Sequence, residues 1–175
     1  MLFNLLVPTQ SAGTSNQNWL IMDKILLILS TTRKSDRCIK EAVEIASKKN
    51  ARLIILFVVD YEVPQKIFDS LTDEGWIGGK TTENLFNAVL DEYSVQGKEK
   101  ILEIEEAAKN KGVDYKSIIE RGTFLEVALS VAEKEQASLI IVTRRKRSRL
   151  SRFFFGSAVA ELEEKVTCEI RIIDE

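Results

Sequence analysis

The segment "KILLILSTTRKSDRCIKEAVEIASKKNARLIILFVVD", residues 24–60, decides the fold of this chain. Its two apolar runs, residues 25–29 and 53–59, are continuous rather than alternating, which is typical of strands buried on both faces of a sheet. Between them, apolar side chains recur at helical spacing, at Ile39, Ala42, Val43 and Ala46. The segment therefore predicts a strand–helix–strand unit with a right-handed crossover.

The same alternation continues to the C-terminus. Further strands are predicted at "DYKSIIERG" (residues 114–122, more polar and nearer an edge), "SLIIV" (138–142) and "EIRIID" (169–174). Residues 61–80 contain Pro64 and three glycines and are predicted to be irregular. The resulting order, β-α-β-loop-α-β-α-β-α-β, predicts an α/β fold with a five-stranded parallel sheet and helices on both faces.

Three helices are predicted after the irregular segment. The first is long, ends near Gly112 and is open to interruption at Gly97; its apolar face is Phe86, Leu90, Tyr93, Ile101, Ile104 and Ala108. The second runs through Val127 and Val131, and Thr123 with Glu126 should form a capping box that satisfies first-turn amides. The third spans about residues 157–165.

Composition limits the possible functions. The 175 residues are 45% hydrophobic and 30% charged, as in one soluble domain. There is no histidine, which excludes His-dependent triads, bases and metal sites, and no metal site is expected. The two cysteines, Cys38 and Cys168, belong to no CxxC pair and are interpreted as buried reduced thiols of a cytoplasmic protein.

Residues 1–21 carry no charge and lack the positive start and long apolar stretch of a signal peptide. We interpret them as a flexible or mis-assigned leader, with residues 22–175 as the single domain. An alternative is an arm that docks on a partner through Leu2, Phe3, Leu5 and Trp19. No apolar run reaches the length of a membrane span, so no membrane association is expected.

The stretch "VTRRKRSRLSRFFFGS", residues 142–157, is the most unusual in the chain. Residues 144–152 hold six of the 25 basic residues and no acid, whereas the formal net charge of the chain is −2. The stretch follows a predicted parallel strand, and ligands of such sheets bind beyond the carboxyl ends of the strands. It therefore falls, with residues 30–36 and 58–61, where a binding site is expected.

Together these segments resemble the universal stress protein family over residues 24–173. The opening β-α-β unit, "GVDYKSIIERGTFLEVALSVAEKEQASLIIV" and "RSRLSRFFFGSAVAELEEKVTCEIRII" correspond to it element for element. The resemblance implies strand order 3-2-1-4-5 in a Rossmann-like, adenine-nucleotide α-hydrolase-like three-layer sandwich. It also implies a homodimer, paired through the last strand at residues 170–173. One branch of the family binds ATP through a loop of the form G-x2-G-x9-G-[ST].

This chain departs from the ATP-binding pattern. Gly156 and Ser157 match the end of the loop, but Thr143 and Lys146 replace its first two glycines. Ser30 stands where the ATP-binding branch has an aspartate, whereas Val58 matches a valine of the adenine pocket. Glycines let a backbone approach phosphates and adopt positive φ. Thr143 and Lys146 carry a β-carbon, so a loop backbone with the same path should be strained at these residues or unable to approach the phosphates.

An anion-binding element nevertheless remains. Gly156 and Ser157 at a helix start offer amides and a hydroxyl, and Arg144, Arg145 and Lys146 could hold a phosphate or other polyanion. We expect a non-enzymatic regulatory or binding module of the stress response with a degenerate nucleotide site. The alternatives are an ATP-binding switch or slow ATPase, and a nucleic-acid or acidic-partner binder acting through residues 144–152. The acidic balance elsewhere makes nucleic acid the weaker partner.

Overall fold

The computed structural model describes residues 22–31, 35–73, 75, 80–144 and 158–174. Its centre is a five-stranded sheet of order β3-β2-β1-β4-β5 in which each neighbouring pair is parallel. The strands are β1 Lys24–Ser30, β2 Arg52–Asp60, β3 Tyr115–Gly122, β4 Leu139–Arg144 and β5 Glu169–Asp174. This confirms the predicted sheet and strand order.

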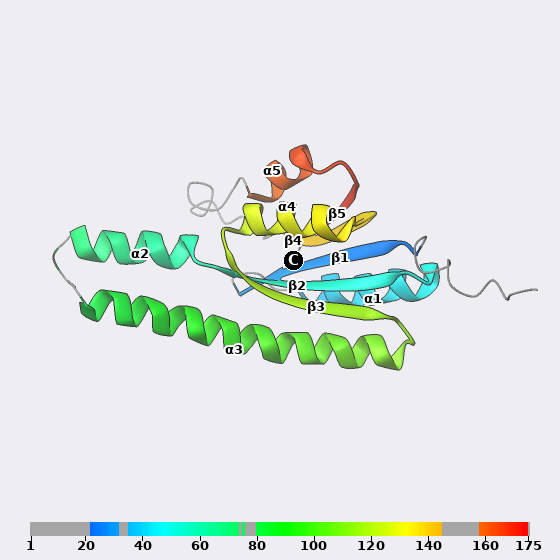
Figure 1. Cartoon of the computed structure of the whole chain (residues 1–175), viewed down its shortest axis with the longest axis horizontal. Coiled ribbons are helices and arrows are strands. Elements are labelled where there is room, and N and C mark those ends of the chain that lie inside the picture. Colours follow the sequence, from blue (N-terminus) through cyan, green and yellow to red (C-terminus); the bar gives the residue numbers. More distant parts are fainter. Residues whose placement is uncertain (1–21, 32–34, 74, 76–79, 145–157, 175) are drawn as a thin grey trace, which may run out of the picture.

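Helices cover both faces of the sheet. On one face lie α1 (Asp36–Lys49) and α3 (Lys80–Asn110), and on the other lie α4 (Phe124–Glu135) and α5 (Ala158–Lys165) (Figure 1). The remaining helix, α2 (Glu62–Asp73), extends past the end of β2 alongside the first half of α3. Among the described helices, none is both long and apolar enough to span a bilayer.

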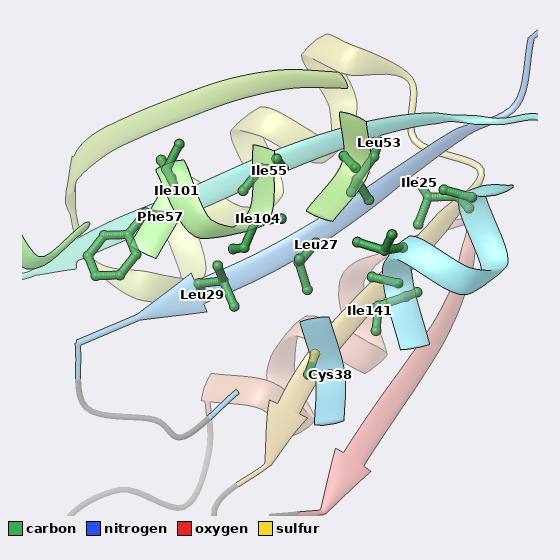
Figure 2. Packing of buried hydrophobic residues seen from close by; sticks show 14 of the residues in the cluster. Ile25, Leu27, Leu29, Cys38, Leu53, Ile55, Phe57, Ile101, Ile104 and Ile141 are labelled. Atoms are coloured by element: carbon green, nitrogen blue, oxygen red, sulfur yellow. The ribbon is translucent and has the colours of Figure 1, made fainter. Parts of the chain in front are cut away.

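Side chains alternate across the pleat and build two separate cores. From β1, Ile25, Leu27 and Leu29 face α1 and α3, where Cys38 and Ile104 complete the packing (Figure 2). The intervening side chains of the same strand, Leu26 and Ile28, face α4 and α5. Residues 25–29 are all 2% exposed or less, which explains the continuous apolar run in the sequence.

The prediction that residues 61–80 are irregular was wrong for residues 62–73, which form α2. The carboxylate of Asp60 accepts a hydrogen bond from the amide of Glu62 at 2.9 Å and so begins the helix. Pro64 lies within the first turn, where a missing amide is tolerated. Phe68 packs edge-on against Phe86 of α3 with ring centroids 5.6 Å apart, so an apolar contact holds α2 in place.

Two further local expectations were corrected. Gly97 does not interrupt α3, which is continuous over 31 residues. At the start of α4, the Thr123 hydroxyl makes no hydrogen bond to a first-turn amide. It donates instead to the carboxylate of Glu126 at 2.8 Å, so the two residues of the predicted capping box bind each other.

Candidate functional site

The carboxyl edge of the sheet contains the change in strand order that defines a ligand site in this class of fold. The chain leaves β1 toward β2 on one side, and β4 lies on the other side of β1. Such switch points leave a crevice between the two outgoing connections. Four of the predicted site residues lie at this edge, Ser30 on β1, Val58 on β2, and Thr143 and Arg144 on β4.

The pleat divides these residues between the two faces. Ser30 and Val58 are Cα partners in adjacent strands, and both continue the set of side chains that faces α4 and α5. Thr143 follows Val142, which belongs to that set, and is therefore directed to the opposite face, toward α1. The structure thus brings Ser30 and Val58 together and separates Thr143 from them.

The solvent exposure of Val58 and Ser30 limits how each residue could contact a ligand. Val58 is fully buried in the core under α4, so a ligand could contact its backbone but not its side chain. Ser30 is 5% exposed, and its Oγ has no hydrogen-bond partner in the structure. The Oγ1 of the following residue, Thr31, is likewise buried and unpartnered. Buried hydroxyls are normally hydrogen-bonded, so this pair calls for an explanation.

Strand β4 runs further than the sequence predicted. It was expected to end at Val142, but Thr143 and Arg144 continue it, paired with Ile173 and Asp174 of β5. Thr143 is therefore an extended strand residue and not a strained loop residue at positive φ, which corrects the expectation of strain there. The physical reason is that a β-branched side chain suits a strand better than a phosphate loop.

Arg144 is engaged by an acidic residue that sequence analysis did not single out. Its guanidinium donates to both carboxylate oxygens of Asp174, at 2.8 and 3.2 Å. This hydrogen bonding raises the pKa of Arg144 above its ordinary value. Arg37 also donates to the backbone carbonyl of Asp174, at 3.3 Å. The sequence could have revealed this pair through the positions of the two residues, because each lies at the C-terminal end of one of two adjacent parallel strands.

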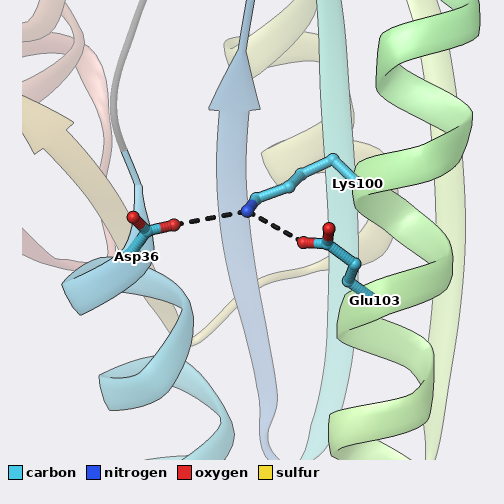
Figure 3. A network of polar contacts seen from close by, with 3 residues as sticks. All are labelled: Asp36, Lys100 and Glu103. Atoms are coloured by element: carbon cyan, nitrogen blue, oxygen red, sulfur yellow. Dashed lines mark hydrogen bonds and ion pairs between the residues drawn. The ribbon is translucent and has the colours of Figure 1, made fainter.

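The carboxylates near this edge have structural contacts. Asp60 begins α2, as described above. Asp36, the first residue of α1, accepts from the ammonium of Lys100 at 3.3 Å, and Glu103 accepts from the same group at 2.9 Å (Figure 3). These contacts, with Glu103 the largest cause, raise the pKa of Lys100. The three residues tie the start of α1 to α3.

Several predicted features lie outside the described residues, namely Arg145, Lys146, Gly156, Ser157 and the phenylalanines at 153–155. Both cysteines are reduced; Cys38 is fully buried as predicted, but Cys168 is only partly buried. Within the part of the chain that the structure describes, there is no cluster of three or more residues able to hold a metal ion.

The parallel sheet, its strand order and the polar switch point define a Rossmann-like α/β protein of the adenine-nucleotide α-hydrolase-like type. The model of the universal stress protein family matches residues 22–173, and the chain belongs to that family. Residues 1–21 lie outside the match. The resemblance inferred from the sequence is confirmed.

Known proteins of the family are similar along nearly the whole domain. Universal stress protein YxiE of Bacillus subtilis is 26% identical over 153 residues, which cover 87% of this chain and 99% of YxiE. The structure of UspA from Lactobacillus plantarum matches with a TM-score of 0.66 at 18% identity, covering 86% of this chain and 97% of that one. A universal stress protein from Archaeoglobus fulgidus, solved in complex with dAMP, has a TM-score of 0.55 at 13% identity, covering 87% and 97% of the two chains. Another family member was solved in complex with cAMP.

Proposed function

We propose that this chain is a non-catalytic regulatory module that binds a nucleotide at the carboxyl edge of its sheet, through a site altered from the family's ATP-binding pattern. The observation that carries the proposal is the pair of buried, unpartnered hydroxyls of Ser30 and Thr31 at the switch point. A ligand that fills the crevice would supply the missing hydrogen bonds. The dAMP and cAMP complexes of related proteins favour a nucleotide as that ligand.

The two ends of the nucleotide would be held differently. The helices α4 and α5 begin at this edge, and residues 156–157 precede α5, so the phosphates belong on the β4 side. The base then belongs over the ends of β1 and β2, beside Ser30 and the backbone of Val58. Because β4 continues through Thr143 and Arg144, the phosphate loop begins later than a glycine-based loop would. We expect phosphate binding to depend on cationic side chains, including Arg145 and Lys146.

A binding role fits the residues better than a catalytic one. The chain has no histidine. Asp60 and Asp174, which end strands at this edge, are held by the α2 amide and by Arg144. A carboxylate that already accepts structural hydrogen bonds is a poor general base, since those bonds stabilise its ionised form. We therefore expect nucleotide occupancy, and not turnover, to be the signal.

Calorimetric titration of Mg-ATP, with inorganic tripolyphosphate as the control, tests this proposal. ATP should bind at least about tenfold more tightly, equivalent to about 1.4 kcal/mol from the nucleoside end. Equal binding of the two would reduce the site to a general anion site, and absence of both would contradict the proposal. Incubation with Mg-ATP for hours should produce no ADP above a protein-free control; enzyme-dependent ADP would support the slow-ATPase alternative.

We also propose that two copies pair through β5. This strand is an edge of the sheet, its Ile170 and Ile172 are only partly buried, and unpaired strand edges of this kind tend to be covered. Light scattering at micromolar concentration should give the mass of a dimer. A monomeric mass under those conditions would rule out this pairing.

A further inference from the structure

A groove lies at the amino edge of the sheet, opposite the edge that carries the proposed nucleotide site. It has a volume of about 640 Å³ and is formed where α4 and α5 end and the chain returns to β5 (Figure 1). All of its lining residues belong to the segments 129–137 and 165–168. It is therefore a feature of the helical layer and not of the switch point.

The floor of the groove is apolar and continues the core beneath α4 and α5. Five lining side chains pack against that core and are only partly buried, so they leave apolar surface open to the groove: Leu129, Ala132, Ala137, Val166 and Cys168. The two charged residues of the lining, Glu133 and Lys165, have opposite signs. A groove with an apolar floor and balanced charge suits an uncharged, apolar occupant.

The N-terminal part of the chain enters the sheet beside this groove. The amide and the hydroxyl of Ser138 both donate to the carbonyl of Lys24, at 2.9 and 3.1 Å, and Ser138 directly follows the lining residue Ala137. Lys24 lies on the same face of β1 as Leu26, which packs beneath α4 and α5. The residues that precede Met22 are therefore attached next to the groove.

The attached segment matches the groove in chemistry and in reach. Residues 1–21 lie outside the described residues and carry no charged side chain, and the last three, Trp19, Leu20 and Ile21, are large and apolar. Trp19 is five residues from Lys24, and an extended chain covers at most about 3.6 Å per residue, which gives a reach of about 18 Å. Covalent attachment gives the segment an effective concentration on the order of millimolar, so a small contact area is sufficient for docking.

We propose that residues 19–21 dock in the groove of their own chain, with the indole of Trp19 against the apolar floor between α4 and α5. The contact covers apolar core side chains at the amino edge and shields the thiol of Cys168. It gives the docking arm a surface within the same molecule, whereas the sequence alone left only a partner as its target. The docking does not depend on nucleotide binding at the carboxyl edge, so either proposal can fail without the other.

Tryptophan fluorescence of the full-length chain tests the docking. Trp76→Phe leaves Trp19 as the only tryptophan, and its emission should lie at shorter wavelength in the native protein than in urea, because docking shields the indole from water. Ala132→Lys adds a charged side chain to the groove and should move the native emission to longer wavelength. Ser130→Lys is the matched control, because Ser130 is exposed on α4 outside the groove, and it should leave the emission unchanged. Native emission equal to that in urea, or no difference between the two lysine variants, would overturn the proposal.

The reactivity of Cys168 gives a second readout without any change in the groove, which covers the case in which Ala132→Lys does not fold. Changing residues 19–21 together to serine should make the native reaction of this thiol with an aromatic disulfide reagent at least about fivefold faster, because docking limits access to the thiol. Changing residues 17 and 18, Gln and Asn, to serine is the control and should leave the rate unchanged. No acceleration in the first variant, or equal acceleration in both, would contradict the docking.

Dilution distinguishes a segment of the same chain from a segment of a second copy. Docking within one chain is independent of protein concentration, so the emission of Trp19 and the protection of Cys168 should persist on dilution. Loss of both on dilution would mean that the groove is filled by a second copy, and would overturn docking within one chain.

Discussion

Gly97, in the middle of α3, lies directly against the ring of Phe57 in β2. A β-carbon at position 97 would stand 2.5 Å from Cδ1 and 2.7 Å from Cε1 of that ring. Both residues are buried, and Phe57 belongs to the core between the sheet and α3 (Figure 2). The absence of a side chain at Gly97 therefore allows α3 to pack closely against the sheet at this position.

Gly97→Ala should destabilise the fold even though alanine is the better helix former. The gain in helix propensity is about 1 kcal/mol, and overpacking against an aromatic ring costs about 1–3 kcal/mol. We expect a net loss of about 1 kcal/mol in the free energy of unfolding, measured by urea denaturation.

Gln96→Ala is the control, because Gln96 is exposed on the same turn of α3. It should be neutral or slightly stabilising. Phe57→Leu combined with Gly97→Ala should cost less than the sum of the two single changes. Additive losses, or a stabilised Gly97→Ala, would show that the contact does not determine the packing of α3.

The sequence predicted the sheet but not the details of its edge. Continuous apolar runs such as residues 25–29 identify buried parallel strands because both faces exclude polar side chains. By contrast, α2 depends on a contact between Phe68 and Phe86, which the one proline and three glycines of residues 61–80 did not indicate. The Arg144–Asp174 pair depends on strand register, and the direction of Thr143 on a two-residue extension of β4. Such features arise from pairing between distant segments.

Lys100→Met should reduce stability by about 0.5–1 kcal/mol at pH 7, since its contacts to Asp36 and Glu103 are largely exposed to solvent. The pKa of Lys100 is raised in the folded state above the ordinary value of 10.5. Its contribution is therefore complete below pH 10.5 and is lost as the pH rises through the folded-state pKa. The stability difference between wild type and variant should shrink in urea titrations at increasingly alkaline pH.

Lys98→Met is the matched control for that experiment. Lys98 is exposed on the same helix, and its replacement should change stability little at any pH. A Lys100→Met deficit that stayed constant from pH 7 to the alkaline end would contradict the role assigned to the charged contacts.

The two thiols should differ sharply in reactivity toward an aromatic disulfide reagent. Cys38 is fully buried and should react only after unfolding, whereas Cys168 is partly buried and should react in the native protein. Burial raises the pKa of Cys168 above 9.0, so less thiolate is present at pH 8 than in a free cysteine. The native reaction should be slow and should continue to accelerate as the pH rises past 9.0.

Absorbance of the released reagent counts the thiols. Native protein should release one equivalent and denatured protein two, which matches the two cysteines of the chain. Cys168→Ser should abolish the native reaction. Rapid native modification with a rate already constant below pH 8 would mean that the pKa of Cys168 is not raised.

Asp174→Asn should strengthen anion binding at the carboxyl edge. In the folded chain the carboxylate of Asp174 neutralises Arg144 through two hydrogen bonds, and both side chains are about half exposed. Removing the negative charge should lower the dissociation constant of tripolyphosphate about three- to tenfold at low salt, because a cation at the edge becomes available to the anion. The free energy of unfolding should fall by less than about 1 kcal/mol, as for other exposed ion pairs.

Asp114→Asn provides the matched control. Asp114 pairs with Arg52 at 3.2 Å, with comparable exposure, at the amino edge of the same sheet. Both variants raise the net charge equally, so only a local effect of Arg144 can separate them. A gain in tripolyphosphate affinity confined to Asp174→Asn would place the anion at the carboxyl edge beside Arg144. Equal gains in both variants would indicate a general effect of net charge, and no gain in either would exclude Arg144 from the site.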